Sequence, residues 1–194
     1  MNQEAQLEIQ ITSLAELRLF ARAFIAGTPI GGIVGLFGTL GAGKTALVRS
    51  VVEELGGALE EVMSPTFVLE AVYPLPDNVE RADSTSVRQI NHWDLYRLGD
   101  RLPVPPELGE LAGAPGIFTF VEWPERSPEL LNLLCVNVML DANPAICSGS
   151  EEMVNSSDSE LGEARQIRIG INRNIPFGLT KFDLGPVRNG LLEH

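Results

Sequence analysis

Apolar and polar positions in the first forty residues follow the patterns of a strand, a helix and a second strand. Residues 7–11 have the alternation of a short strand. Ser13 and Glu16 have the spacing of a capping box, and apolar side chains follow at helical spacing until Gly27. These side chains are Leu14, Leu17, Ala21, Phe24 and Ile25. The continuous apolar run 30–37 then predicts a buried strand.

The rest of the chain continues this alternation of strands and helices. A helix is expected over 43–55, then a loop running into a strand over 62–73. The polar, turn-rich stretch 74–88 is consistent with a hairpin or an exposed excursion. Proline and glycine limit residues 102–115 to one short helix at most. Further strands are expected over residues 89–95, 116–122, 133–141 and 165–171. This order indicates an α/β fold in layers around a mainly parallel sheet.

One domain is expected to account for most of the chain. A length of 194 residues suits a single core, which we expect to cover residues 1–171. Inside this range, the stretch from about 142 to 163 holds five acidic residues, many serines and no basic residue, so we expect a mobile loop there. Residues 172–194 are polar and are expected to form a tail, whose last three residues resemble part of a purification tag.

The charge and the apolar content limit the partners that this chain can bind. The formal net charge is −12, so we do not expect the chain to bind nucleic acid by itself, because phosphate contacts drive that affinity. The most apolar stretch, 130–140, is too short to span a membrane, and no secretory pattern precedes the first strand. Two cysteines without a C-x-x-C pair fit a reducing compartment. A cytoplasmic protein without membrane contact is therefore expected.

A glycine-rich run between the second strand and the second helix predicts a bound polyphosphate. Residues 38–45 read Gly-Thr-Leu-Gly-Ala-Gly-Lys-Thr, the G-x-x-x-x-G-K-T motif in its strand–loop–helix setting. Its backbone N–H groups and the helix start favour an anion. Lys44 would reach the β- and γ-phosphates, and the Thr45 hydroxyl would ligate Mg²⁺. The residues expected to contact the nucleoside triphosphate are Gly38, Leu40, Gly41, Ala42, Gly43, Lys44, Thr45 and Ala46.

Two carboxylates stand at strand ends where they can act on the phosphates, and an indole follows one of them. Asp94 would either serve as the Walker B acid, near Mg²⁺ directly or through water, or belong to the polar face of a surface strand. His92 shares its strand face and either orients Asp94 or covers the sheet. Glu122 ends an apolar strand and either aligns the attacking water or caps a turn. Trp123 suits packing or a base-stacking surface.

A loop before the Walker B strand offers a second hydroxyl for the metal. The segment 64–67 reads Ser-Pro-Thr-Phe, and Thr66 in such a loop can reach Mg²⁺ and sense the γ-phosphate, as switch loops do. The same string is also an ordinary turn signature, so both interpretations stay open on composition alone.

Four segments in this order resemble the signature of the TsaE (YjeE) family, small bacterial ATPases required for threonylcarbamoyladenosine modification of tRNA. The segments are the phosphate loop, Ser64-Pro65-Thr66-Phe67, His92-x-Asp94-Leu95-Tyr96-Arg97 and Glu122-Trp123-Pro124. The resemblance covers roughly residues 13–171. It implies a P-loop NTPase-type three-layer α/β sandwich around a mainly parallel sheet with some antiparallel strands, and ATP and Mg²⁺ as ligands. It also implies TsaD and TsaB-like subunits as partners and tRNA contact only through that complex. Because the sequence shows no obvious arginine finger or activated nucleophile, we expect slow ATP hydrolysis by the chain alone.

The resemblance also assigns roles to individual residues. By position, Lys44 and Thr45 match the phosphate and metal residues, Thr66 the switch-loop threonine, Asp94 the Walker B acid and Glu122 the glutamate needed for hydrolysis. The expected catalytic residues are therefore Glu122, Asp94 and Lys44. The expected metal ligands are Thr45, Thr66, Asp94 and Glu122. Thr39 stands where the family usually has an acidic residue or asparagine, which leaves its contribution to the loop open.

Two other kinds of phosphate chemistry compete with an ATPase switch. A small-molecule or nucleoside kinase needs an acceptor pocket and usually a lid with several arginines, whereas Arg97, Arg101 and Arg126 are scattered along the sequence. A GTPase usually carries an N-K-x-D string to read guanine, and the sequence contains none. The ATPase is therefore the preferred interpretation, and the kinase is the alternative.

Overall fold

The computed structural model describes residues 6–59, 62–65, 67–80, 86–99, 103–142 and 165–171. Its strands are β1 (Gln6–Ile11), β2 (Ile33–Phe37), β3 (Glu70–Glu80), β4 (Ser86–Asp94), β5 (Ile117–Glu122), β6 (Leu134–Ala142) and β7 (Arg165–Ile171). Its helices are α1 (Leu14–Gly27), α2 (Lys44–Glu54) and α3 (Pro106–Glu110), with two 3₁₀ turns, η2 (Pro124–Arg126) and η3 (Leu130–Asn132).

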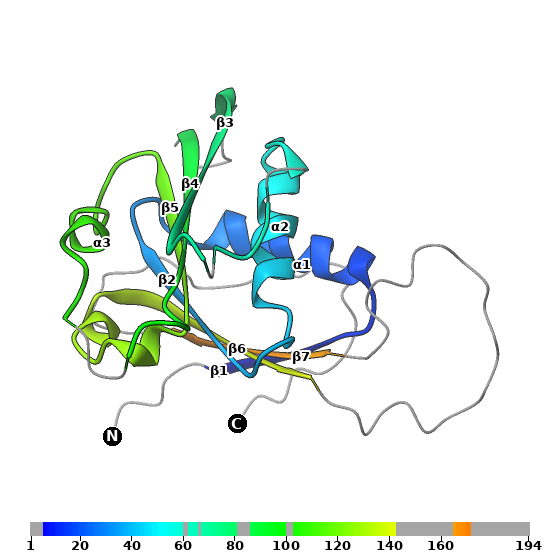
Figure 1. Cartoon of the computed structure of the whole chain (residues 1–194). Coiled ribbons are helices and arrows are strands. Elements are labelled where there is room, and N and C mark those ends of the chain that lie inside the picture. Colours follow the sequence, from blue (N-terminus) through cyan, green and yellow to red (C-terminus); the bar gives the residue numbers. More distant parts are fainter. Residues whose placement is uncertain are drawn as a thin grey trace.

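The strands form one mixed sheet in the order β1-β7-β6-β2-β5-β4-β3 (Figure 1). The four central strands run parallel: β2 pairs with β6 on one side and β5 on the other, and β5 pairs with β4. Antiparallel pairs extend the sheet at both edges, β6 with β7 and β7 with β1 at one, β4 with β3 at the other. This confirms the predicted α/β fold with a parallel centre and additional antiparallel strands.

The parallel register aligns the carboxyl ends of three strands at the same end of the sheet. Asp94, the last residue of β4, is the register partner of Glu122, the last residue of β5. Glu122 is in turn the register partner of Leu36 in β2. The loop after β2 therefore leaves the sheet beside both carboxylates, in agreement with the rule that ligands of open α/β sheets bind at the carboxyl ends of the strands.

Helices and turns cover the two faces of the sheet. Helices α1 and α2 lie on one face, and α3 lies on the other side of the strands (Figure 1). A small apolar cluster on that second side joins Trp93 and Val121 of the sheet to Leu108 of α3 and Leu130 of η3. The three layers that were predicted are therefore present, although the second covering layer consists of short turns and one five-residue helix.

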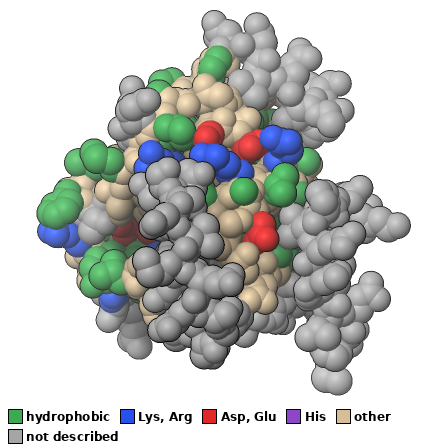
Figure 2. Space-filling view, turned by 90° about the vertical axis from the view of Figure 1, so that its right-hand side faces the viewer, with side chains coloured by type: hydrophobic (Ala, Val, Ile, Leu, Met, Phe, Trp, Pro, Cys, Tyr) green, Lys and Arg blue, Asp and Glu red, His purple; other side chains and the backbone are tan. Residues whose placement is uncertain are grey.

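Ion pairs join the exposed sides of the two long helices. Arg18 and Arg22 of α1 contact Glu53 and Glu54 of α2, at 2.7 and 2.8 Å. Figure 2, a view from the side of these helices, shows basic and acidic side chains next to one another on this face. Because such exposed pairs contribute at most about 1 kcal/mol each, the docking of α1 and α2 depends on their buried faces.

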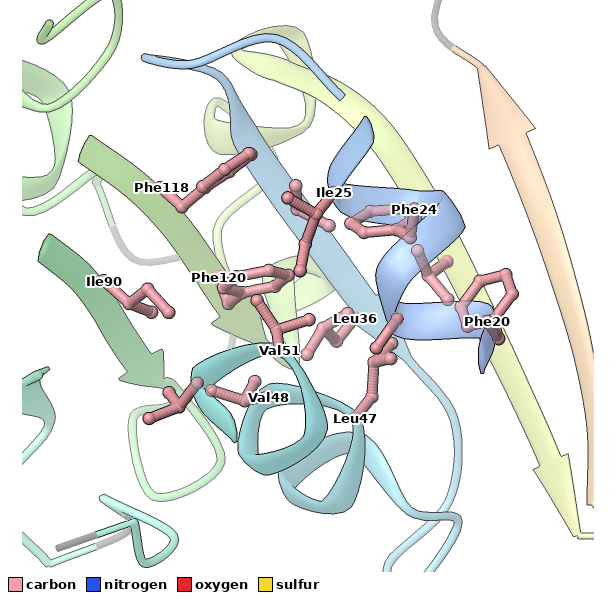
Figure 3. Packing of buried hydrophobic residues seen from close by; sticks show 14 of the residues in the cluster. Phe20, Phe24, Ile25, Leu36, Leu47, Val48, Val51, Ile90, Phe118 and Phe120 are labelled. Atoms are coloured by element: carbon pink, nitrogen blue, oxygen red, sulfur yellow. The ribbon is translucent and has the colours of Figure 1, made fainter. Parts of the chain in front are cut away.

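The main core lies between α1, α2 and the sheet (Figure 3). Phe24 of α1 contacts Phe20 of the same helix and Phe120 of β5, with ring centroids 5.8 and 6.3 Å away. Leu47 and Val51 of α2 are fully buried in the same cluster. Burial of each such side chain contributes roughly 1.5–3 kcal/mol. The core therefore fixes the start of α2 relative to β2 and β5.

The helix start predicted at Ser13 is confirmed, with one shift in detail. Ser13 caps α1, and its Oγ accepts the Glu16 N–H at 3.2 Å. The Glu16 carboxylate accepts the Thr12 N–H at 2.7 Å, rather than the Ser13 N–H of a regular capping box. The Thr12 hydroxyl donates to the same oxygen at 2.9 Å, which explains why the carboxylate reaches one residue further.

Other boundaries differ where prolines were interpreted as turns. The stretch 74–80, expected as turn-rich, continues β3, so the hairpin is longer than predicted. β3 is the outer strand of the sheet, where the missing N–H groups of Pro74 and Pro76 are tolerated. The short helix expected within 102–115 is α3. Residues 143–163 of the expected acidic loop and the 172–194 tail lie outside the described residues.

None of the helices in the described ranges is both long and apolar enough to cross a bilayer. Of the two cysteines, Cys135 is a free, fully buried thiol in β6, and burial raises its pKa to about 12. A thiol that is buried and keeps its proton in this way has low reactivity.

Candidate nucleotide-binding site

The loop between β2 and α2 has a backbone that requires glycine. Gly38, Gly41 and Gly43 have positive φ values of 135°, 79° and 100°. A Cβ on Gly38 would lie 2.1 Å from the Leu140 carbonyl oxygen, so no other residue fits without displacing β6. A Cβ on Gly41 would meet nothing within 4 Å. The loop is therefore fixed against the sheet at its start and open at its middle.

Lys44 is held inside the curve of this loop. Its Nζ donates to the carbonyl oxygens of Gly38 at 2.8 Å and Thr39 at 2.9 Å, and it lies 4.1 Å from the centre of the Trp123 ring. Burial lowers the pKa of Lys44, and the nearby carboxylates of Glu122 and Asp94 act against that shift. A desolvated ammonium held by carbonyl oxygens is a strong anion contact, because little water must be removed from it.

The start of α2 faces the same loop without a side chain that caps it. Gly43 is the N-cap, no side chain accepts from the first turn, and no acidic residue lies there. Helix N–H groups at such an end are ready to bind an anion. The exposed Leu40 and the open position at Gly41 place this end near solvent. The loop, Lys44 and the helix end together fit a polyphosphate.

Glu122 is buried and bonded to two of the predicted site residues. Its Oε1 accepts the Thr45 hydroxyl proton at 2.6 Å and lies 2.9 Å from His92 Nε2. His92 is fully buried and Glu122 is 3% exposed. His92 therefore contacts Glu122 on the neighbouring strand, which corrects the prediction that it orients Asp94 or merely covers the sheet. The alternative role of Glu122 as a turn cap is wrong, since its carboxylate contacts Thr45 and His92.

Asp94 has partners that differ from those of Glu122, although the two residues lie side by side on neighbouring strands. Its Oδ2 accepts the Ser64 hydroxyl proton at 3.0 Å, and its Oδ1 accepts the Tyr96 N–H at 2.9 Å. It is 3% exposed. The loop that contains Ser64 therefore reaches the site through Asp94, while the phosphate loop reaches it through Glu122.

Tyr73 is a site residue that the sequence patterns did not single out. Its hydroxyl donates to the Met63 carbonyl at 3.1 Å and lies 3.3 Å from His92 Nδ1. Burial raises the pKa of Tyr73, so the hydroxyl keeps its proton at neutral pH. The position belongs to an apolar strand pattern, and only the pairing of β3 with β4 brings it to His92.

Trp123 has a left-handed backbone conformation directly after β5, with φ 59° and ψ 46°. This conformation turns the indole back over the site, where it contacts Lys44 and lies 5.0 Å from the Tyr96 ring. The packing role considered for Trp123 is thus present. A base-stacking role stays a prediction.

At the carboxyl ends of the parallel strands, the structure brings together five of the predicted site residues: Lys44, Thr45, Asp94, Glu122 and Trp123. Ala42 is fully buried in the core, so only its backbone can contact a ligand, and the partly buried Ala46 packs against the core. Leu40 is 75% exposed at the rim of the loop. Thr66 lies outside the described residues.

The side-chain oxygen atoms at these strand ends are of the kind that Mg²⁺ prefers as ligands. They are the Thr45 hydroxyl and the carboxylates of Asp94 and Glu122. Within the described ranges, no three His, Cys, Asp or Glu side chains are grouped as a metal site. A divalent ion here would therefore need ligands from the nucleotide or from water as well, which is how Mg²⁺ is usually bound with phosphates.

Comparison with known proteins identifies the family. The family model described as threonylcarbamoyl adenosine biosynthesis protein TsaE matches residues 11–146. A tRNA threonylcarbamoyladenosine biosynthesis protein TsaE of Rickettsia typhi is 32% identical over 148 residues, which is 73% of this chain and 93% of the relative. A protein of the same name from Synechocystis is 38% identical over 106 residues, covering 53% of this chain and 60% of the relative.

A solved structure supports the fold. The crystal structure of Bacillus subtilis YdiB aligns with a TM-score of 0.54 at 20% identity, over 88% of each chain. At this identity the likeness concerns the fold alone. The family model, in contrast, spans most of the α/β domain, including every residue discussed at the site. This chain belongs to the TsaE family.

Proposed function

We propose that this protein is a Mg²⁺-dependent ATP-binding protein and slow ATPase that supports a TsaB–TsaD assembly in threonylcarbamoylation of the tRNA adenosine next to the anticodon. The observation that carries the proposal is the cluster of Lys44, Thr45 and Glu122 at the end of β2 and β5. Lys44 supplies positive charge for the phosphates, and Thr45 and Glu122 supply oxygen atoms for a metal and for water.

Different residues at the site would bind the phosphates and hold the metal ion. The phosphate loop and the uncapped start of α2 hold the phosphates, and Lys44 neutralises part of their charge. Thr45, Asp94 and, by family resemblance, Thr66 would hold Mg²⁺. When bound, this ion would offset charge on the β- and γ-phosphates. Thr45 can serve as a ligand while it donates its proton to Glu122, because the hydroxyl oxygen keeps its lone pairs.

Glu122 is proposed to align the attacking water. Its hydrogen bonds to Thr45 and to His92 both end on Oε1. Oε2 is therefore the oxygen that we expect to accept the proton of the water. A carboxylate fixed in this way contributes through position more than through basicity, which is consistent with slow turnover by the chain alone.

Contact with partner subunits is proposed for the loop that contains Ser64. The side chains of Met63, Phe67 and Val68 are 72%, 82% and 70% exposed. Exposed apolar side chains that cluster in one segment favour a protein partner. Because Ser64 in the same segment contacts Asp94, a partner here could influence hydrolysis.

Calorimetric titration of the full chain with ATP, with and without Mg²⁺, tests the first half of this proposal. We expect binding that strengthens with Mg²⁺ and a preference of at least tenfold over GTP. Hydrolysis is then measured with and without the TsaB–TsaD pair, and we expect it to rise with the pair. No heat with Mg-ATP would reject nucleotide binding, and fast turnover without gain from the pair would reject the partner-dependent role.

A further inference from the structure

A chain of hydrogen bonds joins Glu122 to the backbone of Met63. His92 lies in its middle, with Nε2 2.9 Å from Glu122 Oε1 and Nδ1 3.3 Å from the Tyr73 hydroxyl oxygen. The Tyr73 hydroxyl also donates to the Met63 carbonyl oxygen at 3.1 Å. Tyr73, His92 and Glu122 are 3%, 0% and 3% exposed. Water therefore does not compete for these bonds, and each proton must be shared among the groups present.

Tyr73 has one hydroxyl proton and two acceptors within reach. An ionised Glu122 needs the proton of His92 on Nε2, and a neutral imidazole then has a lone pair on Nδ1. The Tyr73 proton can bond to that lone pair or to the Met63 carbonyl, but it cannot bond fully to both. The position of the Met63 carbonyl therefore affects the bond that His92 receives.

The Met63 carbonyl belongs to a segment that touches the second carboxylate as well. Ser64 donates to Asp94 Oδ2 at 3.0 Å, next to Met63 in the sequence. The Met63 side chain is 72% exposed, so an outside contact can reach the segment without entering the site. A small displacement of residues 62–65 would change the surroundings of both carboxylates.

We infer that Tyr73 is a positioning residue that couples the segment 62–65 to Glu122 through His92. When the Met63 carbonyl withdraws, the Tyr73 hydroxyl donates its hydrogen bond to His92 Nδ1 instead, which fixes the imidazole with Nε2–H toward Glu122. When the carbonyl returns, it competes with His92 for the hydrogen bond of the Tyr73 hydroxyl. The imidazole is then less firmly oriented, and its hydrogen bond to Glu122 weakens. The inference rests on the proposed function, because it describes how hydrolysis at the same site is regulated.

Tyr73→Phe tests the inference, since it removes the hydroxyl and keeps the ring. We expect kcat for ATP hydrolysis to fall about tenfold, the usual scale for a residue that orients a site group, with KM within about twofold. Added to Glu122→Gln, the same change should have almost no further effect, because both act on one group. Equal kcat in Tyr73→Phe and the parent would overturn the inference, and so would a full additional loss in the double variant.

Thr28→Val is the matched control for a lost buried hydroxyl. Thr28 is fully buried and donates to the Phe24 carbonyl at 2.8 Å, near the amino end of β2 and away from the site. We expect it to lower the melting temperature as much as Tyr73→Phe without lowering kcat. A similar fall of kcat in both variants would mean that Tyr73 acts only through stability, and would reject the inference.

A spectroscopic readout separates this inference from the proposed ATPase activity. The chain has two histidines, so His194→Gln leaves His92 as the single imidazole for ¹⁵N NMR. In this background we expect the Nδ1 signal to be that of a hydrogen-bonded acceptor, and to shift when Tyr73→Phe is added. An unchanged signal overturns the inference even if the protein hydrolyses ATP. A shifted signal in a protein that binds no ATP would instead leave the relay in place and reject the ATPase.

Discussion

The phosphate loop and the segment 62–69 approach the same two carboxylates, but they are held in different ways. The phosphate loop is fixed by backbone: its first glycine touches Leu140 of β6, and Lys44 bonds to the loop carbonyls. Residues 62–65 and 67–69 are tied to the strands by the Ser64–Asp94 and Tyr73–Met63 bonds and by the Asp94 N–H, which donates to the Leu69 carbonyl, while their outer apolar side chains are exposed. We therefore expect the phosphate loop to be the more rigid element and this segment the more adjustable one, with Glu122 and Asp94 between them.

The largest expected effect distinguishes Lys44 from Arg49, the other positive charge of α2. Lys44→Ala should weaken ATP binding about 1,000-fold, or about 4 kcal/mol, because it removes a charge that is desolvated inside the loop. Titration calorimetry measures this loss. Arg49→Ala, which removes an exposed charge from the same helix, should change the affinity less than threefold. Similar losses in both variants would contradict a specific role for Lys44.

The rigidity of the phosphate loop can be tested at its glycines. Gly38→Ala should lower the free energy of unfolding by about 3 kcal/mol, since the new Cβ would overlap the Leu140 carbonyl. Gly41→Ala should cost only about 1 kcal/mol, because it meets no atom within 4 Å and adds only the strain of a positive φ. Urea denaturation of both variants gives the comparison. Equal losses would show that contact with β6 does not hold the loop.

Glu122→Gln separates binding from hydrolysis. The amide can still accept from Thr45, so ATP affinity should change less than threefold, whereas the rate of hydrolysis should fall about 100-fold. Single-turnover measurements report the chemical step, and calorimetry reports the affinity. Hydrolysis at the parental rate would rule out the role proposed for Glu122.

The smallest effect is expected on the outer side of the adjustable segment. Phe67 is 82% exposed, and its ring lies 3.9 Å from the Arg97 guanidinium carbon. Phe67→Ser should therefore lower the free energy of unfolding by less than about 1 kcal/mol. Thermal and urea denaturation check this value. A loss of several kcal/mol would mean that Phe67 holds the segment in place, and the contrast with the phosphate loop would disappear.

The two regions also differ in how far the sequence predicts them. The phosphate loop follows from local rules, because glycine spacing, the lysine and the helix start are close together in the chain. β5 and β7 were likewise predicted to within one residue, since β5 is an apolar run that ends at Glu122 and β7 alternates apolar and polar residues. Asp94 and Glu122 were placed at strand ends from such local patterns.

The contacts between distant segments could not be predicted in this way. The bond between His92 and Glu122 depends on the pairing of β4 with β5, and the bond between Tyr73 and His92 depends on the pairing of β3 with β4. Neither register can be derived from one strand alone. The stretch 74–80 was interpreted as a turn because proline disfavours strands, and only its place at the edge of the sheet explains the exception.

The stacking of Trp123 over the Lys44 ammonium has an optical consequence. The chain contains two tryptophans, and the other, Trp93, is buried in the small apolar cluster beneath α3. An anion that enters the loop changes the electric field at one indole and leaves the second as a constant background. The intrinsic tryptophan fluorescence of the unlabelled protein can therefore report the binding and release of a ligand in real time.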